Sequence, residues 1–262
     1  MKADLFNAKG AAEVLFTARQ NAAPCDPVAG PYGIETLEQA YAVQAELINQ
    51  WGYDDQTQAG YKLGVTDTRV QEAMALEHPL FGHLLSGWDY MDGDTIPASR
   101  LITPKLEGEV AFLFRATLDD PELSEEALLD GLKGVLPALE ICDSAFAGWP
   151  KSLFDAAADN LSSGLYVLGS ELKDPRELNL TNLEMKLYRN NDAAVTGHSR
   201  QCMGNPLTAC LWLVRELARR GTPIRAGELI LSGSLGPMVE TKAGDKIRLE
   251  IGELGSLECR FS

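Results

Sequence analysis

The ten residues 105–114, KLEGEVAFLF, contain the pattern on which the fold prediction depends. Side chains two positions apart in an extended strand lie on the same face. Glu107 and Glu109 therefore share a face with two apolar residues, Ala111 and Leu113. The opposite face holds Gly108 and only apolar side chains: Leu106, Val110, Phe112 and Phe114. Because both faces are apolar toward the end of the segment, the pattern predicts a strand covered on both sides.

Two carboxylates on one face of a covered strand repel each other and lose hydration, so they need a proton, a basic partner or a metal ion. A third acid, Glu140, lies in the apolar run 135–141, VLPALEI. Three converging carboxylates would suit a hard divalent cation such as Mg²⁺ or Mn²⁺, which prefers oxygen ligands. The alternative is that Glu107 and Glu109 lie on an exposed edge strand and that Glu140 pairs with an arginine.

The sequence around these segments predicts an α+β fold. Apolar residues recur at helical spacing over 37–51, with Thr36 as a helix cap, whereas glycines and prolines interrupt 59–96 and predict loops and short elements. Further strands are expected at 229–232, 246–251 and 257–261. Helices are expected at 124–132, beginning at Ser124, and at 206–220 after the Asn205 cap. We therefore expect a helical N-terminal region, 1–75, and a β-rich catalytic domain, 76–262, with a mixed, largely antiparallel β core.

The charge balance excludes some classes of partner. The 262 residues include 38 acids and 23 bases, a net charge of -15, which repels nucleic acid and anionic membrane surfaces. No run of 18 apolar residues and no signal peptide are evident. The five cysteines form no CxxC pair and are expected to be reduced thiols in a cytoplasmic protein.

Other polar residues are weaker candidates for a site. Lys62 lies in the apolar segment GYKLG, 60–64, where its ammonium could balance an anion or could simply extend to the surface. The segment DNLSSG, 159–164, is explained by turn formation, but it could also present Asp159 and Ser162 to a carboxylate ligand. Ser232 begins SGSLG, which resembles a nucleophile elbow without its first glycine.

Several segments together resemble one known family. They are GYKLGVT (60–66), PKLEGE (104–109), LPALE (136–140), ADNLS (158–162), GNPL (204–207), LGPM (235–238) and GSL (255–257). The chain resembles the 2-keto-4-pentenoate hydratase and 4-oxalocrotonate decarboxylase family of the fumarylacetoacetate hydrolase superfamily. The resemblance implies a β-roll around Mg²⁺ or Mn²⁺ held by Glu107, Glu109 and Glu140, with Lys62 transferring a proton. It also implies a homo-oligomer, which could associate with a pathway partner enzyme.

One segment departs from the hydratase pattern. Hydratases carry an aspartate directly after the proline of this motif, where EHPLFG, 77–82, has Leu80. The decarboxylase branch has an apolar residue at the position of Leu80 and a glutamate three positions earlier, which Glu77 matches. The segment LGPM, 235–238, instead resembles the hydratase branch.

The resemblance predicts a lyase that adds water to a small anionic 2-hydroxy-2,4-dienoate or its 2-oxo tautomer in aromatic-compound degradation. Lys62 and Glu77 are the expected catalytic residues. The expected substrate-binding residues are Leu80, Asp159, Ser162 and Ser232. The alternatives are a 4-oxalocrotonate-type decarboxylase, an acylpyruvate C–C hydrolase that uses Glu77 and His78, and a non-catalytic partner subunit.

Overall fold

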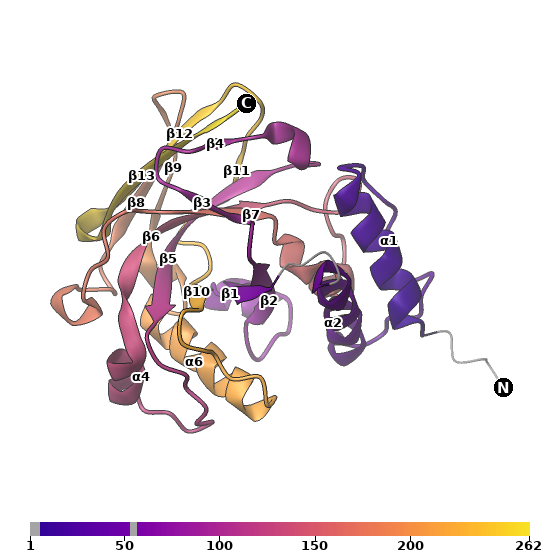
Figure 1. Ribbon diagram of the computed structural model, residues 1–262, viewed down its shortest axis with the longest axis horizontal. Coiled ribbons are helices and arrows are strands. Elements are labelled where there is room, and N and C mark those ends of the chain that lie inside the picture. Colours follow the sequence, from indigo (N-terminus) through magenta and orange to yellow (C-terminus); the bar gives the residue numbers. More distant parts are fainter. Residues whose placement is uncertain (1–5, 53–56) are drawn as a thin grey trace.

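Two β-sheets and six α-helices form the described part of the protein, residues 6–52 and 57–262 of a computed structural model (Figure 1). The helices are α1 (Ala8–Gln20), α2 (Leu37–Gly52), α3 (Thr68–Ala73), α4 (Glu125–Gly131), α5 (Leu153–Ala158) and α6 (Pro206–Arg219). The strands are β1 (Gln58–Gly64), β2 (Leu80–Leu85), β3 (Asp89–Met91), β4 (Thr95–Ile96), β5 (Lys105–Phe114), β6 (Leu132–Cys142), β7 (Leu165–Leu168), β8 (Glu184–Arg189), β9 (Asp192–His198), β10 (Leu229–Leu231), β11 (Val239–Glu240), β12 (Lys246–Ile251) and β13 (Gly255–Phe261).

The larger sheet has the strand order β2-β1-β10-β5-β6-β7-β3, with β11 paired to β5. Its pairs are antiparallel except for β1 with β10 and β3 with β7. Strands β5 and β6 form its longest pairing, with Glu107 directly opposite Glu140. The sheet is therefore mixed and largely antiparallel, as the sequence predicts.

The smaller sheet, β4-β13-β12-β8-β9, packs on the larger one at Gly108. A Cβ atom at Gly108 would lie 2.7 Å from Leu249 Cδ1 and 3.1 Å from Met185 Cγ, so a side chain there would push the sheets apart. This contact covers the apolar face of β5 and leaves the face of Glu107 and Glu109 on the opposite side. The prediction that β5 is covered on both sides is confirmed, because Val110, Ala111 and Phe112 are all fully buried.

The helices α1, α2 and α5 enclose a second apolar core beside the sheets, with Leu15, Val43, Leu47 and Phe146 at its centre. In Figure 1, α1 and α2 lie at the opposite end of the molecule from the smaller sheet. Buried Gln44 of α2 connects the two parts, because its side-chain amide donates to the carbonyl oxygens of Ala157 and Phe81.

The predicted helix starts at Thr36, Ser124 and Asn205 are confirmed, because each side chain accepts a hydrogen bond from a backbone N–H of the first turn. The segment 59–96 consists of short elements joined by loops, as expected, and its strands β1, β2 and β3 are part of the larger sheet. The change from helix to strand thus falls between α2 and β1, before residue 75, and the division into domains 1–75 and 76–262 stays a prediction.

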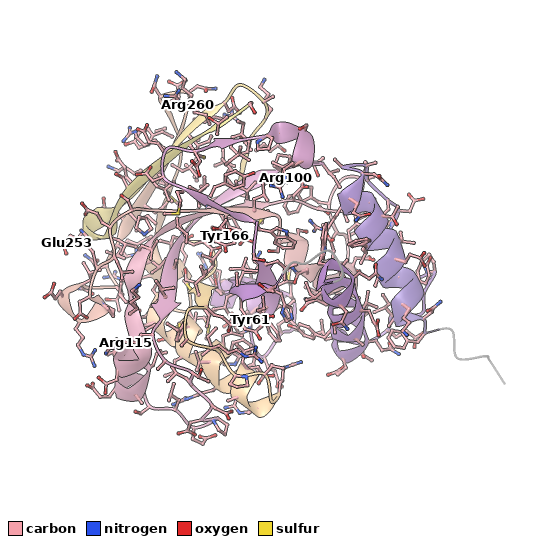
Figure 2. All side chains as sticks on the ribbon, in the orientation of Figure 1. Tyr61, Arg100, Arg115, Tyr166, Glu253 and Arg260 are labelled. Atoms are coloured by element: carbon pink, nitrogen blue, oxygen red, sulfur yellow. The ribbon has the colours of Figure 1, made fainter. Side chains whose placement is uncertain are left out.

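Side chains follow the expected distribution between core and surface (Figure 2). Tyr61 and Tyr166 are buried between the elements, whereas Arg115, Glu253 and Arg260 extend from the periphery. None of the described helices combines the length and the apolar character needed to cross a bilayer.

Candidate active site

Strands β1, β5 and β6 bring together three carboxylates and one ammonium. Register pairs Glu107 with Glu140, and Glu109 lies two residues along the same face of β5. Lys62 reaches the group from β1, with its Nζ atom 2.8 Å from Glu140 Oε1. The same Nζ atom donates to the backbone oxygen of Leu161 at 3.2 Å. We call Lys62, Glu107, Glu109 and Glu140 the carboxylate cluster.

The carboxylate cluster is removed from water. Glu109 and Glu140 are completely buried and Lys62 is 2% exposed. Burial, and then the charges of Glu140 and Glu107, raise the pKa of Glu109 well above its usual value. Burial also raises the pKa of Glu140, although the Lys62 ammonium opposes this effect. Burial alone would lower the pKa of Lys62, but the surrounding acidic groups, Cys142 and Glu140 first, raise it, so Lys62 is an ammonium.

Two buried carboxylate oxygens of the cluster have no hydrogen-bond donor among the described residues, namely Glu109 Oε1 and Glu140 Oε2. The other oxygen of Glu109 accepts the backbone N–H of Gly233 at 2.8 Å. Buried polar atoms are nearly always paired, and one ammonium does not neutralise three carboxylates. The set therefore fits a hard divalent cation with oxygen ligands, as the sequence predicts for Mg²⁺ or Mn²⁺.

A left-handed turn fixes the Lys62 ammonium. Asn160, Leu161 and Ser162 all have positive φ angles, 53°, 52° and 55°, a conformation that costs non-glycine residues about 1–2 kcal/mol each. The turn aims the Leu161 carbonyl at Lys62, and the Asn160 side chain bonds both the N–H and the C=O of His83 in β2. The segment 159–164 thus positions Lys62.

The other expected substrate-binding residues have internal partners. Asp159 forms an ion pair with Arg19 at 2.8 Å and accepts from the Ala145 N–H, and burial raises its pKa to about 6. Ser162 donates to Asp159 at 3.4 Å. Ser232 donates to the Gly233 carbonyl oxygen and accepts the Val110 N–H. Their contact with substrate stays a prediction.

Glu107, one member of the carboxylate cluster, lines a cavity of about 370 Å³. Its other lining residues come from β1, α3, two loops and the 3₁₀ helix Ser199–Gln201: Leu63, Gly64, Val65, Thr66, Asp67, Arg69, Val70, Gln201, Ser234, Gly236, Pro237 and Met238. Sequence reasoning missed Arg69, a cation at this cavity whose guanidinium forms an ion pair with Asp67 at 2.6 Å. In the sequence, the one feature that could have pointed to Arg69 is its position shortly after the GYKLG segment, 60–64.

Leu80 and Glu77 differ in their placement. Leu80 is buried. In the β1–β2 register, Lys62 pairs with Gly82, and Gly64, two residues after Lys62, pairs with Leu80. Because paired residues share a face of the sheet, Leu80 lies on the same face as Lys62. Glu77 is exposed, and neither residue is among those that line the cavity. The structure brings Lys62 and the three metal-ligand candidates together, and Glu77 lies outside that group.

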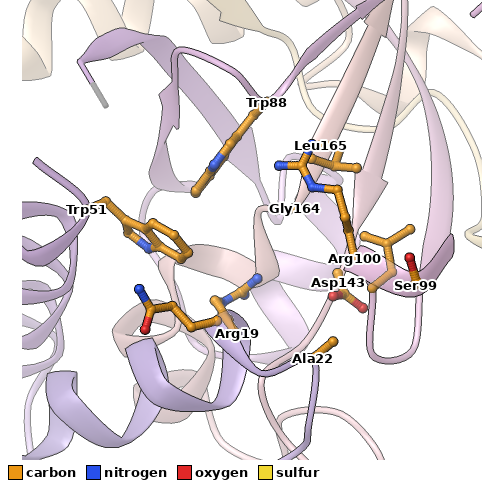
Figure 3. A pocket seen from close by; sticks show the side chains of 11 residues that line it. Arg19, Ala22, Trp51, Trp88, Ser99, Arg100, Asp143, Gly164 and Leu165 are labelled. Carbon is orange, nitrogen blue, oxygen red and sulfur yellow. The ribbon is translucent and has the colours of Figure 1, made fainter. Parts of the chain in front are cut away.

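A second cavity of about 310 Å³ lies between the helices and the sheets (Figure 3). Trp51 and Trp88 contact each other edge to face on one side, and Arg19, Arg100 and Asp143 supply charged groups. No member of the carboxylate cluster lines this cavity among the residues that the structure describes. The Arg19–Asp159 ion pair, next to the left-handed turn, lies between this cavity and the carboxylate cluster.

Comparison with known proteins agrees with this geometry. The family model described as "Fumarylacetoacetate (FAA) hydrolase C-terminal" matches residues 89–262. A 2-keto-4-pentenoate hydratase of Paraburkholderia xenovorans (strain LB400) is 39% identical over 251 residues, covering 96% of this chain and 93% of the relative. The chain belongs to the fumarylacetoacetate hydrolase family. The resemblance found in the sequence motifs is thereby confirmed.

Other members of the fumarylacetoacetate hydrolase family extend the comparison. A 2-hydroxyhexa-2,4-dienoate hydratase of Comamonas testosteroni is 33% identical over 250 residues, 95% of each chain. The solved structure of 4-oxalocrotonate decarboxylase from Pseudomonas putida G7, complexed with magnesium and adipate, superposes with a TM-score of 0.91. It is 27% identical and covers 97% of each chain. Both of these sequence relatives are hydratases, whereas this structural neighbour is a decarboxylase.

Proposed function

We propose that this chain is a metal-dependent hydro-lyase that adds water to a 2-hydroxy-2,4-dienoate or its 2-oxo tautomer in the degradation of aromatic compounds. The observation that carries the proposal is the carboxylate cluster, which joins one buried ammonium to three buried or partly buried carboxylates beside a cavity. The curated hydratase relatives, aligned over nearly the whole chain, support the same reaction.

Glu107, Glu109 and Glu140 would hold Mg²⁺ or Mn²⁺, since the three side chains share one face of the β5–β6 pair, and Glu109 Oε1 and Glu140 Oε2 lack another partner among the described residues. When bound, the cation supplies Lewis acidity that stabilises negative charge on the C2 oxygen of the substrate. The half-buried Glu107 carboxylate is the member of the cluster that lines the cavity, so substrate reaches the cluster past this residue. The walls formed by α3 and by residues 234–238 limit the size of the substrate.

Lys62 is the proposed proton donor. Its Nζ atom carries a proton because the acidic groups around it raise its pKa, and the Leu161 carbonyl fixes its direction. Ketonisation of the dienol requires a proton at the terminal carbon, and water then adds at C4 of the conjugated ketone. A proton at Lys62 Nζ, held next to Glu140 and the Leu161 carbonyl oxygen, can serve the first of these steps.

The remaining predicted roles belong to the same proposal. Glu77 would position the water, and Leu80, Asp159, Ser162 and Ser232 would contact or support the substrate. Leu80 lies on the Lys62 face and Ser162 belongs to the turn that holds Lys62, which supports these two residues. Arg69 at the cavity is a further candidate partner for a substrate carboxylate.

The second candidate function is decarboxylation of a dicarboxylic dienoate. Leu80 supports it, because a buried leucine on the Lys62 face cannot transfer the proton that the hydratase aspartate would. The TM-score of 0.91 with a decarboxylase supports it as well. An acylpyruvate hydrolase is less well supported, since the His78 ring lies 5.8 Å from the Trp212 ring and Glu77 faces solvent. A non-catalytic subunit is also less well supported, because buried carboxylates that repel one another lower stability and would serve no purpose in it.

Product analysis tests the proposal. The purified protein with Mg²⁺ is incubated with a monocarboxylic and a dicarboxylic dienoate, and added water and released CO₂ are measured. We expect water addition to the monocarboxylic substrate, and loss of it in Glu140→Gln. Leu80→Asp should raise water addition. Release of CO₂ from the dicarboxylic substrate without any hydration would contradict the hydratase assignment.

The finer architecture and the assembly are also proposals. We infer that the two sheets form a β-roll next to a helical N-terminal part, and that the protein is a cytoplasmic homo-oligomer that could bind a pathway partner enzyme. The five free cysteines, four of them buried, support a reducing compartment. Light scattering on the purified protein should give a mass that is a multiple of 28.4 kDa.

A further inference from the structure

A thiol lies beside the carboxylate cluster. Cys142 is two residues after Glu140 in β6, so the two side chains share a face. Its Sγ atom lies 3.2 Å from Glu107 Oε2 and 3.8 Å from Lys62 Nζ. Ligand atoms of Cys142, Glu107 and Glu140 all lie within 4.8 Å of one another, close enough to contact one ion.

A second observation points to a ligand at this place. Glu140 Oε2 is buried without a hydrogen-bond donor among the described residues, and it belongs to the same three-residue group. The thiol contacts a carboxylate and an ammonium, whereas buried Cys202 donates to the backbone oxygen of Ser232. Apolar packing therefore does not account for the surroundings of Cys142.

Sulfur changes which cation a site of oxygen ligands prefers. Thiolates bind soft and borderline cations such as Zn²⁺, whereas Mg²⁺ and Mn²⁺ prefer carboxylates and water. We propose that Cys142 joins Glu107 and Glu140 as a ligand for a thiophilic divalent cation, Zn²⁺ or Cd²⁺, which the site binds in preference to Mg²⁺. The inference rests on the proposed function only in that both use the carboxylates of Glu107 and Glu140.

Coordination by sulfur breaks the S–H bond and forms a metal–sulfur bond, so one proton must leave. The thiol donates its hydrogen bond to Glu107 Oε2, and Glu107 lines the cavity. The proton can therefore pass to the Glu107 carboxylate and from there to solvent. Thiophilic cations would then compete with the Mg²⁺ or Mn²⁺ of the proposed reaction.

Cadmium binding to the full-length, metal-free protein tests this inference. Cd²⁺ bound to a thiolate gives an ultraviolet charge-transfer band, and calorimetry gives the affinities for Cd²⁺ and Mg²⁺ separately. We expect the band in the native protein and in two control variants. These are Cys25→Ser, at the partly exposed cysteine, and Cys259→Ser, at a buried one.

Cys142→Ser should lose the band and bind Cd²⁺ at least tenfold more weakly, with less than a threefold change for Mg²⁺. Cys142→Ala provides the same comparison if the serine variant does not fold, and circular dichroism checks both. A band that persists in the Cys142 variants, no band in the native protein, or an equal loss for both cations would refute the inference. The hydratase proposal is tested by product analysis, so it can fail while the Cd²⁺ result holds, and the reverse.

Discussion

Replacing Lys62 by methionine removes the ammonium that lies against the three carboxylates. Its Nζ atom is 2.8 Å from Glu140 Oε1, and the side chains of both residues are at most 3% exposed. Removing one partner of a buried ion pair costs about 3–5 kcal/mol, because the other charge stays buried without compensation. Lys62→Met should therefore lower the free energy of unfolding of the cation-free protein by about that amount.

Cations should reverse this effect. With Lys62 replaced, no ammonium at Nζ opposes a second positive charge next to Glu140, so we expect Mg²⁺ to bind Lys62→Met more tightly than the native protein. Saturating Mg²⁺ should then restore most of the lost stability. Turnover should still fall by about 10²–10⁴-fold, because the proposed proton donor is gone.

Urea denaturation with a chelator and with Mg²⁺, together with calorimetry, measures these quantities. The double variant Lys62→Met/Glu140→Gln is the control, and it should be more stable than Lys62→Met alone, because it no longer buries the unpaired Glu140 charge. Native stability of Lys62→Met in the presence of chelator would refute the reasoning, as would a weaker affinity for Mg²⁺.

Three further outcomes can be checked. Glu107→Gln should lose Mg²⁺ binding in calorimetry with an unchanged circular-dichroism spectrum; full Mg²⁺ affinity would remove Glu107 from the cation site. Burial lowers the pKa of His83 from 6.5 to about 4. The unfolded chain binds more protons between these values, so stability should fall by up to about 3 kcal/mol as pH drops from 6.5 to 4, and His83→Gln should flatten that slope. Gly82→Ala should destabilise the protein by about 1–3 kcal/mol in urea, because its Cβ would lie 2.7 Å from the Asn160 carbonyl oxygen, whereas Gly30→Ala, with open space around it, should change little.

Local patterns in the sequence predicted much of the fold. The alternation over 105–114 gave the strand and the shared face of Glu107 and Glu109, and the caps at Ser124 and Asn205 gave two helix starts. The motifs also identified the family. These features are readable because residues a few positions apart determine strand alternation and helix capping.

The strand pairing within the segment 59–96 could not be predicted from local patterns in the same way. Its glycines resemble those of a loop, but Gly60 sits where β1 meets the backbone of β10, with no room for a Cβ, and Gly82 sits where β2 meets Asn160. Close approach of distant backbones, rather than a local turn, requires both glycines. The sequence alone does not distinguish these two reasons for a glycine.

The reactive groups can be named from the amino-acid sequence alone: three glutamates in apolar strands and a lysine between glycines. Which of these groups meet depends on the folded structure. Strand register set Glu140 opposite Glu107, and packing brought Lys62 to Cys142 across 80 positions and Arg19 to Asp159 across 140. This difference arises because alternation and capping depend on neighbours in the chain, whereas register and side-chain pairing depend on how the whole core packs.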